Sequence, residues 1–236
     1  DRRNFSEQTI AFCSVAGDNE RGYAIEKEGN GAKRGLCQRM IKPFFMLEMP
    51  PEAAEKEGNF MRIKYLGTAA CEGVPAAFCR CGVCERSRRD GGRNIRTRSQ
   101  ALIDDTLLLD LNADTYIHSL YYGLDLPSIH TCLITHDHED HLYADELINR
   151  QEGFAHGIDG QPIHIYGTYP AYAKVVAAVD KGTGYADHNV MEERVVPVRV
   201  RAFEPFEAEG YRITPLAAQH DVRCEPVIYL IEKEGK

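Results

Sequence analysis

The chain has 236 residues and a formal net charge of −8, with 43% hydrophobic and 27% charged residues. A chain of this size can bury a core, and its acidic balance argues against binding along a nucleic-acid polymer, although a small phosphorylated substrate fits. With no apolar run of membrane-spanning length and no secretory signal at the start, we expect a cytoplasmic protein without a membrane partner.

The first sixty residues differ from the rest of the chain. They carry Gly, Glu and Lys in irregular blocks, whereas Met61 opens a clean strand pattern. We therefore predict a poorly patterned N-terminal extension over 1–60 and one domain over 61–236. The extension is either non-native sequence from a gene boundary or an N-terminal subdomain with a weak pattern.

From residue 61 onward, strand-like and helix-like patterns alternate. Short runs rich in apolar and β-branched residues predict strands at 61–66, 101–103, 106–111, 131–135, 162–166, 195–200, 211–217 and 227–231. Asp104 and Asp105 are interpreted as a turn between two of them. Apolar positions at helical spacing predict helices at 113–122, 142–155 and 169–180. Such alternation is typical of an α/β or layered α/β/α architecture.

A cluster of histidines and carboxylates, residues 136–141 (HDHEDH), follows a predicted buried strand. In an extended segment His136 and His138 point the same way and can hold one metal ion. Asp140 and His141 face a second position beside the first. Imidazole and carboxylate suit zinc, with manganese and iron as alternatives. Two ions about 3.5–4 Å apart would hold a hydroxide that is nucleophilic near neutral pH.

Two other interpretations of this cluster are weaker. A solvated, histidine-rich turn would rarely fall at the end of an apolar strand. A zinc-protease helix of the H-E-x-x-H type is excluded, because Leu142 stands where the second histidine would be needed. The sequence therefore predicts a metal site.

A second cluster, C-x-C-x-x-C, consists of Cys79, Cys81 and Cys84. Three thiolates so close together can occupy three corners of a tetrahedral structural zinc site, with the fourth ligand from elsewhere. The alternative, three free surface thiols, would oxidise readily. Four further cysteines are interpreted as isolated small apolar residues: Cys13, Cys37, Cys132 and Cys224.

Two residues outside the clusters are candidates for the same site. His220 follows a predicted strand and, pointing back, would complete the ligands of the first metal. Asp110 ends an apolar strand and can orient a ligand histidine through its second ring nitrogen, although a turn-capping role is nearly as well supported. The remaining histidines are interpreted as surface or structural residues: His118, His130, His156, His164 and His188.

Together these features resemble the metallo-β-lactamase superfamily over residues 61–236. The resemblance rests on the H-x-H-x-D-H loop at a strand end, the Asp ending an earlier strand and the later His. Within the superfamily, the segment 67–76 (GTAACEGVPA) followed by C-x-C-x-x-C is similar to the PhnP-type cyclic phosphodiesterases. That branch is related to tRNase Z and carries an additional structural zinc.

The resemblance implies an α/β fold of the metallo-β-lactamase type, a four-layer αββα sandwich that is incomplete in its C-terminal half. It implies that two catalytic metals are bound, the first by His136, His138 and His220 and the second by Asp140 and His141. Asp140 and His141 are then also the catalytic residues. The structural zinc would be bound by Cys79, Cys81 and Cys84. The implied reaction is hydrolysis of a small cyclic phosphodiester, such as a phosphoribosyl 1,2-cyclic phosphate, by metal-bound hydroxide.

The superfamily pattern continues beyond the strand predicted at 227–231, to an Asp that bridges the metals and to further histidines. This sequence begins at Asp1 and stops at Lys236 before any of them. We therefore expect a fragment that binds the second metal weakly and is poorly active. Metal content and turnover equal to those of a C-terminally extended version would contradict this expectation.

Two other functional classes stay open. One keeps the fold but changes the bond, to a thioester, a lactone or RNA; an RNA nuclease is expected to need an RNA-gripping arm, which the acidic balance does not support. The other is a non-catalytic accessory protein resembling pyrroloquinoline-quinone biosynthesis protein B, which departs from the full histidine motif. The intact motif favours the phosphodiesterase. The expected partners are a small phosphorylated substrate and a second copy of the chain in a homodimer.

Overall fold

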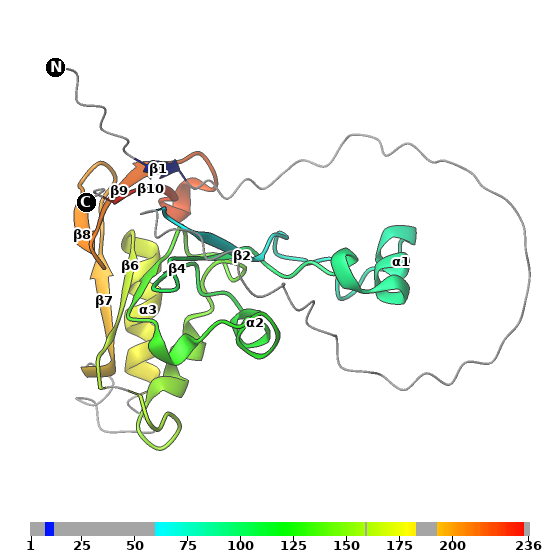
Figure 1. Ribbon diagram of the computed structural model, residues 1–236, viewed down its shortest axis with the longest axis horizontal. Coiled ribbons are helices and arrows are strands. Elements are labelled where there is room, and N and C mark those ends of the chain that lie inside the picture. Colours follow the sequence, from blue (N-terminus) through cyan, green and yellow to red (C-terminus); the bar gives the residue numbers. More distant parts are fainter. Residues whose placement is uncertain (1–7, 12–59, 159, 183–192, 234–236) are drawn as a thin grey trace, which may run out of the picture. The chain divides into compact units, whose positions relative to one another are not determined.

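The computed structural model describes residues 8–11, 60–158, 160–182 and 193–233 (Figure 1). The described residues belong to one compact unit. Most of the predicted N-terminal extension lies outside them, so that prediction is not tested. Among the described residues, no helix has the length and apolar character that crossing a membrane requires.

A six-stranded sheet runs through the centre of this unit, and its strands lie side by side in chain order. The strands are β2 (Ile63–Gly67), β3 (Gln100–Ile103), β4 (Leu107–Leu109), β5 (Thr131–Leu133), β6 (Ile163–Gly167) and β7 (Val195–Arg199). The first three pair antiparallel, and β4 to β7 pair parallel. Asp104 and Asp105 both have positive φ and form the predicted turn between β3 and β4.

A second, antiparallel sheet has the order β1-β10-β9-β8. Its strands are β1 (Gln8–Ala11), β8 (Phe206–Ala208), β9 (Tyr211–Ala217) and β10 (Val227–Lys233). Alternate residues of β9 and β10 are buried, as expected when one face of an antiparallel sheet covers a core. Tyr211, Ile213 and Tyr229 pack in one cluster with Ile103 and Leu133 of the central sheet. The two sheets therefore face each other.

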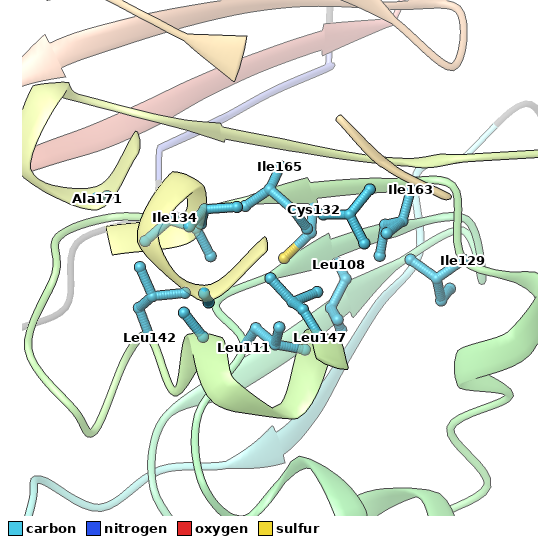
Figure 2. Packing of buried hydrophobic residues seen from close by; sticks show 14 of the residues in the cluster. Leu108, Leu111, Ile129, Cys132, Ile134, Leu142, Leu147, Ile163, Ile165 and Ala171 are labelled. Carbon is cyan, nitrogen blue, oxygen red and sulfur yellow. The ribbon is translucent and has the colours of Figure 1, made fainter. Parts of the chain in front are cut away.

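Helical segments cover the opposite face of the central sheet. The two α-helices there are α2 (Thr115–Tyr121) and α3 (Tyr169–Gly182), and a 3₁₀ helix, η3 (Ala144–Arg150), lies against α3. Figure 2 shows the resulting core, in which Leu108, Cys132 and Ile165 of the sheet pack with Leu147 and Ala171 of the helical layer. The described residues thus supply three successive layers of the predicted sandwich: helices, sheet and sheet.

The predicted helix over 142–155 is wrong, because only the short η3 forms there. Backbone hydrogen bonds from Tyr143 N to Leu111 O (2.7 Å) and from Leu111 N to His141 O (2.8 Å) hold the chain beside the end of β4. These bonds, with the parallel bridge between Leu111 and Leu142, keep the residues after His141 in a non-helical conformation, so no α-helix begins at Leu142. Gly153, with φ of 94°, ends the segment in a conformation that a helix excludes.

Apart from short 3₁₀ turns, three elements have no counterpart in the predictions, and one of them, β1, lies within the stretch 1–60 where no strand was predicted. The helix α1 (Gly82–Asp90) begins inside the cysteine cluster, where the sequence indicated only a glycine-containing loop. The strand β8 has three residues, FEA, and lacks the apolar run that made the equally short β4 and β5 predictable. The other predicted strands and helices are present, with ends that shift by at most two residues.

Candidate metal centre

The histidine-rich loop lies at the carboxyl ends of neighbouring parallel strands. The loop follows β5, and Asp110 follows β4, so both emerge at the same edge of the sheet. Asp110 N donates to Leu133 O (2.8 Å), and Ile134 N donates to Tyr166 O (2.8 Å). These bonds continue the strand pairing into the loop. The edge where β4, β5 and β6 end therefore fixes where the loop begins.

Three imidazoles converge from the two sheets. His136 and His138 belong to the loop after β5, and His220 follows β9 of the second sheet. Their ligand atoms all lie within 4.8 Å of one another, and His138 Nδ1 is 3.2 Å from His220 Nε2. The structure thus brings together the three residues expected to bind the first metal.

The two remaining predicted residues of the loop meet beside this trio. Asp140 Oδ2 lies 3.4 Å from His141 Nε2, and the ligand atoms of both residues are within 4.8 Å of one on His136. The rings of His136 and His141 are 4.1 Å apart. His136 therefore stands between the two groups, whereas the sequence assigned it to the first group alone.

Asp110 holds His141 in one orientation. Its side chain is buried, and its Oδ2 lies 2.7 Å from His141 Nδ1. Its Oδ1 accepts hydrogen bonds from Thr135 N (2.8 Å) and Thr135 Oγ1 (2.9 Å). The backbone of Asp110 has a left-handed φ of 64°, and its carbonyl accepts a bond from Gln100 Nε2 (2.8 Å). With Nδ1 directed at the carboxylate, His141 presents Nε2 to Asp140.

The environment shifts the pKa values of the two buried histidines of the loop, His136 and His141, in opposite directions. Burial, together with the neighbouring histidines, lowers the pKa of His136 to about 3, so this ring is neutral at physiological pH. Burial acts in the same direction on His141. There, however, hydrogen bonds and charges of Asp110 and Asp140 outweigh burial and raise the pKa to about 9. Without a metal, His141 is therefore a cation between two carboxylates.

The donor set fits a divalent ion of the zinc class. Four imidazoles and a carboxylate lie together, and neutral imidazole and carboxylate are preferred ligands of such ions. A metal ion would replace the proton that His141 Nε2 shares with Asp140, because only one of them can occupy that nitrogen. The site thus offers imidazole and carboxylate ligands, and the negative charge of its carboxylates can balance that of a bound cation.

The sequence interpretation of Cys224 as an isolated apolar residue is wrong. Its Sγ lies 3.0 Å from His138 Nε2, and together with Asp221 it forms a further group of donor atoms within 4.8 Å. Burial and the adjacent Asp137 raise the pKa of its thiol to about 11. The spacing His220-Asp221-x-x-Cys224 was the available sequence signal. Cys132, in contrast, is a core residue as expected.

The structure also brings together the predicted cysteine cluster. The Sγ atoms of Cys79, Cys81 and Cys84 lie within 4.8 Å of one another. Cys84 is buried in α1, and hydrogen bonds from its backbone and from Cys79 lower the pKa of Cys81 to about 7. Arg88 donates to the carbonyl oxygens of Cys79 (2.6 Å) and Ala76 (2.5 Å), so its guanidinium braces the loop that carries the cluster.

Of the histidines interpreted as surface or structural, His118 is fully buried in a hydrogen-bond network. Its Nδ1 contacts Gln100 Oε1, and its Nε2 lies 2.8 Å from Thr97 Oγ1. Gln100 in turn donates to the carbonyl of Asp110. His118 thus supports the structure around the site from the side of α2. His188 lies outside the described residues, and the ring of His164 lies beside Tyr166.

No protein-family profile and no curated protein match the chain. Among solved structures, Zn(2+)-bound PqqB from Methylobacterium extorquens is 24% identical, with a TM-score of 0.54 over 75% of this chain and 63% of that one. A diphosphatase from the PhnP family is 23% identical, with a TM-score of 0.53 over 72% and 61% of the two chains. The short form of human tRNase Z is 15% identical, with a TM-score of 0.50 over 75% and 66%.

These similarities establish the fold class. The chain has the metallo-β-lactamase fold, as the sequence motifs predicted. It spans about 61–66% of the length of these three proteins.

Proposed function

We propose that this chain belongs to a metal-dependent hydrolase that cleaves a small phosphodiester. The observation that supports this proposal is the meeting of two predicted donor groups, His136/His138/His220 and Asp140/His141, at one strand edge. Two adjacent cation sites are suited to displacement at phosphorus, because they can stabilise both the attacking and the leaving oxygen. The divalent ions, when bound, would supply Lewis-acid activation of water and of the phosphoryl group.

The protein residues have distinct tasks in this proposal. His136 is neutral, and its ring is available as a ligand without loss of a proton. Asp110 accepts a hydrogen bond from the Nδ1–H of His141 and so leaves Nε2 for coordination beside Asp140. Thr135 saturates the other oxygen of Asp110. The carboxylate is therefore held in one position and continues to orient His141 during turnover.

The choice of a phosphodiester over a thioester, a lactone or RNA rests on a narrower basis. The cysteine cluster after the glycine-rich segment 67–76 is the feature that resembles the PhnP-type branch, and a diphosphatase of that family shares the fold. Arginines near the cluster offer little support, because Arg88 bonds backbone carbonyls and Arg98 pairs with Asp114 at 2.7 Å. Cyclic phosphodiesters are the substrate class that we propose.

Hydrolysis of bis-p-nitrophenyl phosphate by the zinc- or manganese-loaded protein that carries this chain tests the proposal. We expect turnover that a chelator abolishes and that His138→Ala lowers by more than about 100-fold, since a ligand is removed. The matched control is His156→Ala, which removes an exposed imidazole outside the site and should leave the rate unchanged.

Parallel assays with thioester, lactone and RNA substrates decide among the bonds. Faster turnover of one of these than of phosphodiesters would replace the proposed substrate class. Metal bound only at the cysteine cluster, with no turnover of any substrate, would instead favour the accessory class represented by PqqB. Either outcome contradicts the proposal.

A further inference from the structure

The turn after His220 carries two donors that the proposed catalytic set does not use. Asp221 caps the 3₁₀ helix η4 (Val222–Cys224), because its Oδ1 accepts a hydrogen bond from Arg223 N (3.0 Å). Cys224 N donates to Asp221 O (3.0 Å), which closes the turn. The carboxylate of Asp221 and the thiol of Cys224 are thereby brought to the same imidazole, that of His138.

His138 faces different partners with its two ring nitrogens. Nδ1 lies 3.2 Å from His220 Nε2, on the side of the imidazole trio. Nε2 lies 3.0 Å from Cys224 Sγ, on the side of Asp221. The ligand atoms of His138, Asp221 and Cys224 all lie within 4.8 Å of one another. The ring therefore belongs to two groups of donors at once.

A neutral imidazole has one nitrogen with a free lone pair, and the other nitrogen carries the proton. An ion on Nδ1 leaves a proton on Nε2, directed at Cys224. An ion on Nε2 leaves a proton on Nδ1, directed at His220. The two groups of donors therefore exclude each other at His138, and the ion that binds there decides which group is used.

The surroundings of Cys224 favour a cation. Asp137, the residue before His138, contacts the thiol, and its Oδ1 is buried without a hydrogen-bond partner among the described residues. Asp221 adds a second carboxylate, although both of its oxygens also accept hydrogen bonds from Arg223 (3.0 Å at Oδ1 and 2.5 Å at Oδ2). Buried carboxylate oxygens without partners are costly unless a proton or a cation compensates them. An ion beside Sγ would supply that compensation.

We propose that His138 Nε2, Asp221 and Cys224 form an alternative metal site for a soft, thiophilic divalent ion such as cadmium. Binding there converts the thiol to a thiolate, and the proton leaves to solvent. Ions that prefer oxygen and nitrogen donors, such as Mn²⁺, use the imidazole trio instead. Cys224 thus distinguishes ions by their preference for a sulfur ligand, and His138 is the residue for which the two donor groups compete.

Cadmium binding to the full chain tests this site without any measurement of activity. Cadmium–thiolate bonds absorb in the near ultraviolet, so a titration counts the thiolates that become ligands. We expect Cys224→Ser to lose the absorbance of about one thiolate and to bind the corresponding ion at least about tenfold more weakly. Asp221→Asn should weaken the same ion while keeping the thiolate absorbance at saturation.

The control variant is Cys132→Ser, which also removes a buried thiol but lies in the core, away from the donors. It should keep the full absorbance. Where Cys224→Ser fails to fold, cadmium-113 NMR of the unaltered chain replaces it, because an ion with one sulfur ligand resonates apart from one in the three-cysteine cluster. We expect both resonances.

Absorbance that is the same in Cys224→Ser and the unaltered chain, or a spectrum with only the three-sulfur resonance, would overturn the proposal. The thiol would then be a hydrogen-bond donor to His138 and no more. Loss of phosphodiester hydrolysis has no bearing on this result, and an inactive protein can still show the one-sulfur ion. The two proposals therefore fail separately.

Discussion

At the scale of single residues, the centre depends on how Asp110 and Thr135 position His141. Removing the charge of a carboxylate behind a ligand histidine weakens metal binding because the ring loses both its orientation and part of its basicity. The contact is short (2.7 Å) and buried, so solvent cannot replace it. Asp110 is therefore the residue outside the proposed ligands that we expect to matter most.

Asp110→Asn should lower the affinity for the ion at Asp140/His141 by about 10–100-fold while the fold is kept. The amide preserves the shape of the side chain, and its oxygen can still accept from Thr135. Calorimetric titration with zinc measures the change. Asp105→Asn, which alters an exposed turn carboxylate, is the control and should bind as the unaltered chain does. Equal affinities for both variants would contradict the positioning role.

Because the pKa of His141 is raised, the stability of the metal-free protein and its affinity for a metal ion depend on pH in opposite directions. Its pKa rises from 6.5 to about 9 on folding, so the associated stability is fully present below pH 6.5 and is lost as the pH rises through about 9. Metal binding requires the deprotonated ring, so the affinity grows over the same range.

Urea unfolding of the metal-free chain between pH 6 and pH 9.5 should show this loss, and Asp110→Asn should flatten it. Zinc titrations over the same range should show tighter binding at higher pH. A metal-free stability that rises with pH in this window would contradict the assignment of the proton to His141.

The sequence predicted which residues meet at the centre, but not all of their contacts. The five residues of the two predicted donor groups were identified from local properties of the sequence. Four of them lie in one loop with a recognisable spacing, and His220 stands at the end of a predicted strand. Cys224 was missed because its neighbour, His138, lies 86 residues away, and only the β9–β10 connection brings them together. A search for further ligand-type residues in the four positions after His220 would have included Asp221 and Cys224.

At the scale of elements, close backbone contacts fix how β2 joins the rest of the sheet. A Cβ added to Gly67 would lie 1.9 Å from Arg98 O, which is backbone and cannot move aside. The pairing of β2 with β3 shifts register between Tyr65 and Gly67, and the glycine permits this irregularity. The segment 67–76 and, after it, the cysteine cluster follow directly.

Gly67→Ala should therefore lower the free energy of unfolding by about 1–3 kcal/mol or more, as overpacked sites do. Gly82→Ala is the control, since its added Cβ would meet only the flexible end of Arg86 at 3.3 Å. Denaturant unfolding of the metal-free proteins measures both. Equal stabilities would show that the backbone near Arg98 can relax.

Whether a segment forms a strand or a helix was predictable where the local pattern is long. The prediction was wrong where a tertiary contact holds the backbone in another conformation. The strand β6 and the helix α3 have patterns that their own residues determine. The segment after His141 has helical spacing too, yet its backbone pairs with Leu111 instead, and only η3 remains. Local periodicity cannot reveal a contact between residues that are more than thirty positions apart in the chain.

At the scale of the whole unit, Asp104 links the two sheets. It lies in the β3–β4 turn, and its Oδ2 accepts hydrogen bonds from Tyr211 Oη and from Lys233 Nζ (2.9 Å) on the second sheet. Partial burial opposes ionisation, but these bonds and the one from Arg62 N hold the pKa of Asp104 below its ordinary value. The sequence interpretation as a simple turn residue described its backbone and not this link.

Asp104→Asn should destabilise the chain by about 1–3 kcal/mol near neutral pH. Because the folded pKa is lowered, the stability is present above the unfolded value of about 3.9 and is lost as the pH falls through the folded value. The difference between the two proteins should therefore shrink below about pH 4. Unfolding curves at pH 3 and pH 7 measure it, with Asp125→Asn, on an unrelated turn, as the control. A difference that does not depend on pH would exclude the charge of Asp104 as its cause.

The layered architecture was predictable as a class, but its assembly was not. Alternating strands and helices imply a layered α/β fold, yet nothing local specifies that β10 lies between β1 and β9, or that β2 to β7 follow chain order. Those choices depend on which apolar faces meet, such as Tyr229 against Leu133. The resemblance of motifs supplied the fold class that periodicity alone left open.

The contact between His138 and His220 joins residues 82 positions apart, which has a consequence for the protein during its synthesis. At roughly 5–20 residues per second, a ribosome adds His220 roughly 4–16 seconds after His138. For that interval the nascent chain exposes an incomplete set of imidazoles, which holds a metal ion only weakly. Metal loading is therefore expected to be largely post-translational, and so to depend on the metal available in the compartment where the finished chain folds.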